Sequence, residues 1–288
     1  MCLIALAVDL PGPWLLAMAA NRDEFHDRPA IPAAWWGGTE EGVLAGRDLQ
    51  AGGTWLGLRR CPGDFSLRIA ALTNLRPGLM PPAPVLPNRE TPPSRGGLVA
   101  GFLSASADPA AFLDAMTPLA GSYAGFNLLS IALPHPGKVV DAGYLNNLPG
   151  SRPRRLEAGL HVLSNAVLGV EWPKTRLLAD AMAGIMEEHS GGARGSTAMD
   201  DDTDVQLGQA LLEALADRTT APDADLPHTG LEKSRERLLS APFIVDDAYG
   251  TRCSTVLVIS RTGHVYFAER SFDPGGRRTG TVVESFSR

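Results

Sequence analysis

The chain has 288 residues, of which 44% are hydrophobic and 20% charged, and its formal net charge is −6. A chain of this length can bury a large core, and we expect one globular domain spanning 1–288. Because positive charge is not in excess, nucleic acid and anionic membrane surfaces are not expected as partners. Cys2, Cys61 and Cys253 show no CxxC spacing, so neither a disulfide framework nor a structural zinc site is predicted.

The chain begins with two short apolar runs around a turn. Residues 3–9 and 14–20 have strand character, and Pro11-Gly12-Pro13 between them predicts a hairpin. A signal peptide is not expected, because no basic region precedes the apolar run and Asp9 interrupts it. The chain contains no run of about 18 apolar residues, which a membrane-spanning helix needs. We therefore expect a cytoplasmic protein with no membrane insertion.

Further strands and helices follow in groups. Predicted strands, rich in β-branched and aromatic residues, are 54–60, 65–74, 125–133, 138–145, 160–166, 254–260 and 264–270. Helical periodicity marks 96–107, 108–120, 173–189, 204–217 and 231–240. The second helix should begin at Asp108, an N-cap residue followed by proline. Because helices cluster instead of alternating with strands, the pattern predicts an α+β protein with helical layers over sheets.

Two segments have loop composition. Residues 76–95 carry seven prolines, which excludes a central strand or a helix. This loop follows a predicted strand, and a lid over a substrate site and a rigid surface excursion are equally compatible with it. Residues 190–204 are small, polar and acidic, and we interpret them as a solvated linker.

Cys2 can act as a nucleophile if the initiator methionine is removed. The same residue then carries an α-amine, with a pKa of about 7.7–8.0, and a thiol, with a pKa of about 8.5, which together supply base and nucleophile. A cysteine at this position also occurs by chance, so supporting residues are needed. The polar segment 21–25, NRDEF, has the composition of a solvated loop, but the hairpin would return it to the level of Cys2. Arg22 could then stabilise a thiolate or a substrate carboxylate, and Asp23 or Glu24 could hold the α-ammonium.

A series of short motifs resembles the NRDE family, which includes the transport and Golgi organisation protein 2 group. The motifs occur in order across nearly the whole chain: MCLIAL, NRDEF with RPA, LAGRDLQAGGTWLGL, ALTNLRPG, SRGGLV, FNLL, LSNA with WPK, and RCSTVLVI. Residues 77–93 and 190–230 match none of them. Substrate selection is therefore left open by the resemblance.

The same residues are similar to N-terminal-nucleophile hydrolases of the choloylglycine and penicillin V acylase type. This similarity implies a four-layer αββα sandwich. It also implies a set of site residues: Cys2 as nucleophile, Arg22 and Asp23 as a pair, Asn74 and Asn165 as oxyanion donors, and Arg252 as a second arginine. In those hydrolases the Arg and Asp are separated by two residues, so Glu24 is the alternative to Asp23. An amide N–H at a strand end can meet an oxyanion without adding charge, although asparagine also ends strands as a turn residue.

The leading hypothesis is hydrolysis of an amide or thioester bond of a small acyl substrate through a Cys2 acyl-enzyme, with no cofactor. The alternative is a non-catalytic binding or trafficking protein for haem or an acyl lipid, because the resemblance links the family to haem mobilisation, lipid metabolism and secretory organisation. The dipeptide Cys61-Pro62 is of a kind that can ligate haem. The histidines show no HxxH or HExxH spacing, so no protein metal site is predicted.

Overall fold

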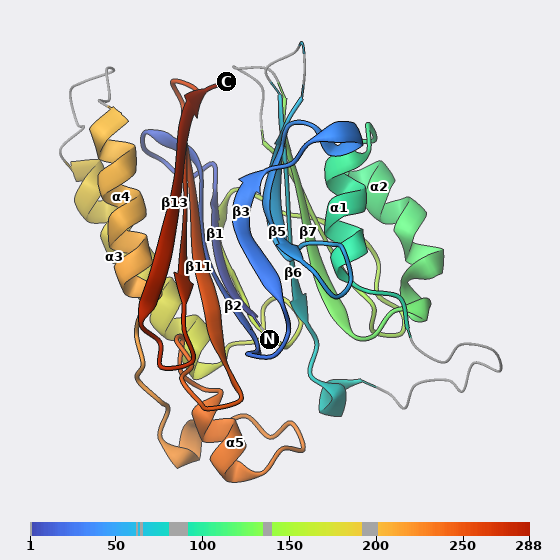
Figure 1. Cartoon of the computed structure of the whole chain (residues 1–288), viewed down its shortest axis with the longest axis vertical. Helices are drawn as coiled ribbons and strands as arrows, with labels where there is room; N and C mark the ends of the chain where they lie inside the picture. Colours follow the sequence, from blue (N-terminus) through green and yellow to red (C-terminus); the bar gives the residue numbers. More distant parts are fainter. Residues whose placement is uncertain (1, 62, 64–65, 81–91, 135–139, 192–200) are drawn as a thin grey trace. The chain divides into compact units, whose positions relative to one another are not determined.

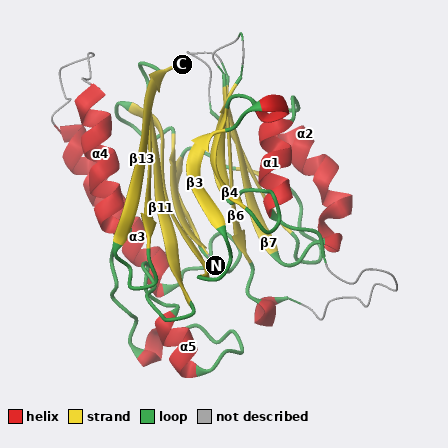
Figure 2. Cartoon of the chain, in the orientation of Figure 1, coloured by secondary structure: helices red, strands yellow, loops and turns green. Residues whose placement is uncertain are grey.

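The computed structural model describes residues 2–61, 63, 66–80, 92–134, 140–191 and 201–288. These residues form a mixed α+β fold with two antiparallel sheets and five α-helices (Figures 1 and 2). The chain divides into two compact units. The first comprises Met1–Asp27, Ala158–Ser164 and Leu168–Arg288, and the second comprises Arg28–Glu157 and Asn165–Val167.

The first unit is built on a six-stranded sheet with the order β10-β1-β2-β11-β12-β13. Its elements are β1 (Cys2–Val8), β2 (Trp14–Phe25), β10 (Gly159–Leu163), α3 (Pro173–Gly191), α4 (Asp201–Ala214), η4 (Asp223–Asp225), α5 (Lys233–Leu238), β11 (Tyr249–Ser260), β12 (His264–Phe272) and β13 (Arg278–Ser287). Helix α3 packs on β1 and β10, and α4 packs on β11 and β12. Between these helices and the sheet lies a core that includes Leu3, Trp14, Met182, Leu207 and Tyr266.

The second unit is built on a seven-stranded sheet with the order β3-β4-β5-β6-β7-β8-β9. Its elements are β3 (Ala30–Trp35), η1 (Gly38–Glu40), β4 (Val43–Asp48), β5 (Leu56–Arg60), β6 (Leu67–Asn74), η2 (Pro77–Leu79), α1 (Gly96–Ser104), α2 (Pro109–Met116), η3 (Thr117–Ser122), β7 (Phe126–Leu133), β8 (Asp141–Asn146) and β9 (Arg154–Arg155). Helix α1 packs on β5, β6 and β7, and α2 packs on β7 and β8. Leu98, Phe102 and Phe126 lie in the core between them.

The predicted amino-terminal hairpin is confirmed, and its second strand is longer than expected. Val8 lies opposite Leu16, and the pairing continues until Cys2 lies opposite Arg22. The segment NRDE therefore does not form a solvated loop: it lies inside β2, with Asn21, Arg22 and Asp23 buried. A strand can accept such residues only when other groups satisfy their polar atoms, which sequence composition does not reveal.

The two glycine pairs of the motifs GGTW and RGGL meet in the second unit. A Cβ built on Gly53 would lie 2.4 Å from the carbonyl carbon of Gly96, and Thr54 donates a backbone hydrogen bond to the Gly96 carbonyl oxygen. Only residues without a Cβ allow the β4–β5 connection to approach the start of α1 this closely.

All five predicted helices are present, and every predicted strand overlaps an observed one. Asp108 accepts a hydrogen bond from the Ala111 backbone nitrogen at 2.7 Å, which confirms the predicted N-cap of α2. The linker predicted at 190–204 is wrong at both described ends, because α3 extends to Gly191 and α4 begins at Asp201. The loop predicted at 76–95, either a lid or a surface excursion, falls largely on 81–91, and the rest of the predicted linker falls on 192–200; both ranges lie outside the described residues. None of the described helices is long and apolar enough to cross a membrane.

Two helical glycines of the first unit predict opposite effects of the same substitution. A Cβ on Gly208 would lie 2.3 Å from the buried Tyr266 ring, whereas one on Gly184 meets nothing within 4 Å. We expect Gly208→Ala to lower the free energy of unfolding by about 1–3 kcal/mol through overpacking. Gly184→Ala should raise it by about 0.5–1 kcal/mol because alanine favours the helix. Urea unfolding of both variants checks this, and equal effects would contradict the packing of α4 described here.

Candidate active site

Cys2, Arg22 and Cys253 form a row across three neighbouring strands. Cys2 lies opposite Arg22 in the β1–β2 pair, and Arg22 lies opposite Cys253 in the β2–β11 pair. Residues opposite each other in neighbouring strands project from the same face of a sheet. All three side chains are buried. The guanidinium of Arg22 is therefore flanked by two thiols, of which sequence reasoning singled out only Cys2.

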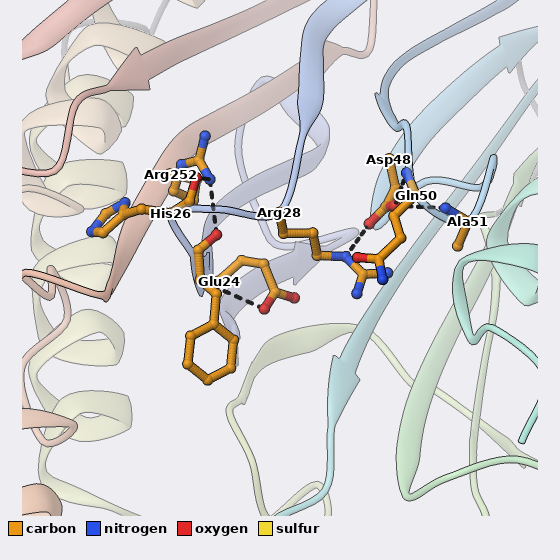
Figure 3. A network of polar contacts seen from close by, with 8 residues as sticks. Glu24, His26, Arg28, Asp48, Gln50, Ala51 and Arg252 are labelled. Carbon is orange, nitrogen blue, oxygen red and sulfur yellow. Dashed lines mark hydrogen bonds and ion pairs between the residues drawn. The ribbon is translucent and has the colours of Figure 1, made fainter. Parts of the chain in front are cut away.

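A β-bulge in β11 sets this register. Thr251 lies opposite Asp23 and Cys253 lies opposite Arg22, so Arg252 is the extra residue of the bulge. The bulge lets both Thr251 and Cys253 lie opposite residues of the NRDE segment. It also leaves Arg252 outside the regular pairing, where its Nη1 donates to the Phe25 carbonyl oxygen at 2.9 Å and to the His26 carbonyl oxygen at 3.1 Å (Figure 3).

Burial dominates the acidity of both thiols in the row. Burial raises the pKa of Cys2, as does the negative charge of Asp23. The positive charge of the amino terminus, the Arg22 charge and a hydrogen bond from the Asp23 backbone N–H act in the opposite direction. The pKa of Cys253 is raised well above its ordinary value, first by burial and then by the negative charge of Glu269. The Arg22 charge thus acts in the expected direction, toward the thiolate, but it does not offset the effect of burial. The desolvation of a thiolate outweighs the attraction of one arginine.

Asp23 is a buried carboxylate held by three neighbours. Thr251 Oγ1 donates to its Oδ1 at 2.7 Å, and the Tyr249 hydroxyl donates to its backbone oxygen at 2.9 Å. Burial raises the pKa of Asp23, and the positive charge of Lys174 opposes that rise. Lys174 is itself buried, in the first turn of α3. The motif WPK contains it, but sequence reasoning gave it no role.

The side chain of Asn21, the first residue of NRDE, is held by hydrogen bonds to other parts of the core. Its Nδ2 donates to the carbonyl oxygens of Leu215 and Pro242 at 2.8 and 2.9 Å, and its Oδ1 accepts from Ser254 Oγ at 2.6 Å. Both ends of the amide are thus occupied by protein groups in the core. Asn21 fastens β2 to the chain after α4 and to β11.

Glu24 is less enclosed than Asp23. Its side chain is half-buried, and Oε1 accepts a hydrogen bond from the next backbone nitrogen, that of Phe25, at 2.9 Å (Figure 3). The pKa of Arg252 is lowered by burial and by the nearby positive charge of Arg22. The structure therefore brings Cys2, Arg22, Asp23 and Arg252 to one end of the first unit's sheet, and places Glu24 at the margin of that group.

The two asparagines predicted as oxyanion donors lie together in the second unit. Asn165 is fully buried, and its Nδ2 donates to the Asn74 carbonyl oxygen at 2.9 Å. The Arg76 backbone nitrogen donates to the Asn165 carbonyl oxygen at 3.0 Å. Asn74 ends β6 half-buried, and its side chain has no hydrogen bond among the described residues. Its amide is thus available to a ligand, whereas that of Asn165 is partly used in holding Asn74.

A third asparagine, Asn127 in the motif FNLL, supports this arrangement and was missed from the sequence. Its Nδ2 donates to Thr73 Oγ1 and to the Ala166 carbonyl oxygen, both at 2.9 Å. Its Oδ1 accepts from the Tyr144 hydroxyl at 2.6 Å. Because Ala166 follows Asn165 directly, Asn127 fixes the segment that carries Asn165 against β6 and β7. The signal in the sequence that could have identified Asn127 is a polar residue within an otherwise apolar strand.

The second unit contains two further features that bear on the sequence motifs. The GRD part of the long motif ends β4, and Asp48 holds the turn that follows. Its carboxylate accepts from the backbone nitrogens of Gln50 and Ala51 at 3.0 and 2.9 Å and pairs with Arg28 at 2.5 Å (Figure 3). A pocket of about 750 Å³ is lined by Trp35, Trp36, Glu41, Gly42, Arg60, Cys61 and Gly63. Within the described ranges, no cluster of His, Cys, Asp or Glu is suited to hold a metal ion.

The fold and site define an α+β protein whose first strand presents a buried thiol beside an arginine and a carboxylate. Residues 1–274 match the family described as Transport and Golgi organisation 2. The chain is 34% identical to the Transport and Golgi organization protein 2 homolog of Bos taurus over 283 residues, which cover 94% of this chain and 93% of the relative. It is 32% identical to the Homo sapiens homolog over 288 residues with the same coverage. It is 26% identical to Transport and Golgi organization protein 2 of Drosophila melanogaster over 298 residues, 99% of this chain and 98% of the relative.

The chain belongs to the Transport and Golgi organisation 2 family, which confirms the resemblance carried by its motifs.

Alanine substitutions at the first and last residues of the NRDE segment should differ in their effect on the free energy of unfolding. Asn21→Ala would leave two buried carbonyls and one buried hydroxyl without their partner, so we expect a loss of at least about 2 kcal/mol in the free energy of unfolding. Glu24→Ala removes only a contact to the adjacent backbone and should cost less than about 1 kcal/mol. Urea denaturation gives both values. Comparable stabilities of the two variants would be inconsistent with a structural Asn21.

Proposed function

We propose that the chain is an N-terminal cysteine hydrolase that cleaves an amide or thioester bond of a small acyl substrate. The observation that carries the proposal is the register in which Cys2 lies opposite Arg22, with Asp23 next along β2. Buried Arg22 and Asp23 beside one thiol, with the buried Lys174 acting on Asp23, are costly to maintain. Their grouping at the first residues of the chain is therefore better explained by chemistry than by packing alone.

The chemistry requires that Cys2 become the first residue. Its α-amine then takes the proton from the thiol, and the sulfur attacks the carbonyl carbon of the substrate, forming a C–S bond. The proton passes from the α-ammonium to the leaving nitrogen or sulfur as that bond breaks. Water, deprotonated by the same amine, then attacks the thioester and releases the acid. Asp23 holds the α-ammonium, and Arg22 lowers the cost of the negative sulfur.

The raised pKa of Cys2 supports the proposal that removal of the first residue activates the thiol. While the nitrogen of Cys2 belongs to a peptide bond, it supplies neither a base nor a positive charge at this position. Burial then keeps the sulfur protonated. The charge of the amino terminus already lowers the pKa of Cys2. An α-ammonium on Cys2 itself would bring this charge to within two bonds of Cβ, and opposite charge favours the thiolate. On this proposal, removal of the first residue activates the site.

The oxyanion part of the proposal rests on Asn74 and Asn165, which both lie in the second unit. Asn165 is covalently next to Ser164, whose Oγ donates to the Cys2 carbonyl oxygen at 3.1 Å. The proposal assigns the chain a four-layer αββα sandwich and gives Asn74 and Asn165 the role of donors to the carbonyl oxygen of the substrate. In this arrangement the Asn74 amide is the principal donor, and Asn165 positions it.

A labelling experiment tests the nucleophile. Untagged protein should have an intact mass one methionine short, and iodoacetamide should alkylate Cys2 faster than Cys253, whose pKa is raised well above normal. In a matched protein with one residue retained ahead of Cys2, alkylation of Cys2 should be at least about tenfold slower, the effect of one pKa unit on the thiolate fraction. Peptide mapping measures the rates at each thiol. A retained methionine, with Cys2 reacting no faster than Cys253, would leave no basis for the hydrolase.

A pair of substitutions tests the asparagines once a substrate turns over. Asn74→Ala should lower kcat by about 10²–10³-fold with KM nearly unchanged, because an oxyanion donor acts on the transition state. The half-buried side chain makes no other hydrogen bond among the described residues, so thermal stability should be preserved. Asn165→Ala, in contrast, should also lower stability, since it removes a buried donor from the Asn74 carbonyl oxygen. A normal kcat for Asn74→Ala would return Asn74 to the role of a strand-ending turn residue.

A second candidate is binding or trafficking of haem or an acyl lipid without turnover. The pocket in the second unit favours it, because Trp35 and Trp36 offer aromatic walls, Arg60 a positive charge and Cys61 a thiol. These groups suit a planar apolar ligand that carries acidic groups. Haem titration should then give a Soret band that is weakened by Cys61→Ser and unaffected by Cys2→Ser. An unchanged Soret band in Cys61→Ser would rule out this pocket as the site.

A further inference from the structure

A serine, a histidine and an aspartate of the first unit are linked in series by hydrogen bonds. They are different residues from Cys2, Arg22 and Cys253 and lie at other positions of the sheet. His264 Nδ1 is 2.6 Å from Asp204 Oδ2, and His264 Nε2 is 2.7 Å from Ser285 Oγ. The other Asp204 oxygen accepts from Trp14 Nε1 at 2.7 Å. The three residues come from α4, β12 and β13. This order of contacts is the arrangement of a catalytic Ser-His-Asp triad, which is recognised by geometry and not by sequence position.

The surroundings fix the orientation of the imidazole. Asp204 and His264 are buried, and the Trp14 indole holds the carboxylate from its far side. Because an ionised carboxylate only accepts hydrogen bonds, Nδ1 of His264 must carry the proton that lies between them. In neutral His264 the other nitrogen, Nε2, is then an acceptor, and the Ser285 hydroxyl donates to it. This is the tautomer in which histidine can take a proton from serine.

Ser285 is the accessible member of the series. It lies on β13, the edge strand of the described sheet, and its side chain is exposed. Val283, two residues earlier on the same face of the strand, is 51% exposed. An edge strand also presents backbone N–H groups that point away from its partner. A small molecule at Ser285 would thus meet a hydroxyl, an apolar side chain and backbone donors.

We propose that Ser285, His264 and Asp204 form a second hydrolytic site, separate from Cys2, that acts on small carboxylic esters with short apolar acyl groups. The family match ends at residue 274, so it does not include Ser285. The proposal does not depend on the activity proposed for Cys2.

The reaction follows from the three contacts. Ser285 Oγ attacks the ester carbonyl carbon while its proton passes to His264 Nε2, and Asp204 stabilises the resulting imidazolium. The C–O bond to the alcohol breaks, and the imidazolium gives its proton to the leaving oxygen. Water then attacks the acyl-serine, losing a proton to His264; the bond between Ser285 Oγ and the acyl carbon breaks, the imidazolium returns its proton to Oγ, and the acid departs. The backbone N–H groups at the edge of β13 face the oxyanion, and Val283 contacts the acyl chain.

The test uses full-length protein carrying Cys2→Ala, so that hydrolysis at Cys2 does not contribute. A fluorophosphonate should label one serine, which peptide mapping should identify as Ser285, and the protein should hydrolyse p-nitrophenyl acetate. Ser285→Ala should abolish labelling and lower the hydrolysis rate at least about 10²-fold. Because Ser285 is exposed, this variant should fold with an unchanged melting temperature.

The matched control is Ser287→Ala, an exposed serine on the same face of the same strand that lies opposite His264 in the register. It should retain labelling and hydrolysis. Asp204→Asn should slow both, because the amide favours the wrong imidazole tautomer. Folded protein that the fluorophosphonate does not label at Ser285, or esterase activity that survives Ser285→Ala, would overturn the proposal. A lower melting temperature of Ser285→Ala without any labelling would assign the series a structural role.

Discussion

The pairing of β2 with β11 is the constraint on which the first unit depends. Strand β2 carries an asparagine, an arginine and an aspartate into the interior, and β11 supplies the groups that make their burial tolerable. Ser254 meets Asn21, Thr251 meets Asp23, and the bulge at Arg252 keeps both contacts in register. A one-residue slip without the bulge would exchange the two faces of the strand and leave buried polar atoms without partners. The bulge is therefore a requirement of this sequence and not an irregularity.

The same burial controls the chemistry available at the end of the sheet. Removing water raises the pKa of Cys2, Cys253 and Asp23 together, which favours their neutral forms. Arg22 and Lys174 act against this effect with fixed positive charge. The ionisation of the Cys2 thiol therefore depends on the opposition between desolvation, which has the larger effect, and neighbouring positive charge.

Local patterns in the sequence were sufficient for much of the fold. The apolar runs 3–9 and 14–20 and the Pro/Gly turn between them predicted the hairpin, and the hairpin brought Cys2 opposite Arg22 as expected. Burial of the NRDE segment was not predictable, because the groups that satisfy Asn21 come from residues 215, 242 and 254. Strand β13 was missed because its residues are largely polar and exposed, so its pairing with β12 leaves no apolar alternation. Lys174 was overlooked because a lysine in a first helical turn normally faces water, and only tertiary packing buries it.

The partners of β2 lie far apart in the chain. Thr251 and Asp23 are 228 residues apart in sequence, and the whole second unit except Asn165–Val167 is encoded between β2 and β10. Contacts of such separation form late in folding because loop closure must precede them. On the ribosome, at about 5–20 residues per second, β2 waits on the order of tens of seconds for β11. During that interval the NRDE side chains are hydrated and ionise as in a peptide, and the amino-terminal residues are accessible to processing enzymes. The altered acidities of the site are therefore acquired only when the last third of the chain has been made.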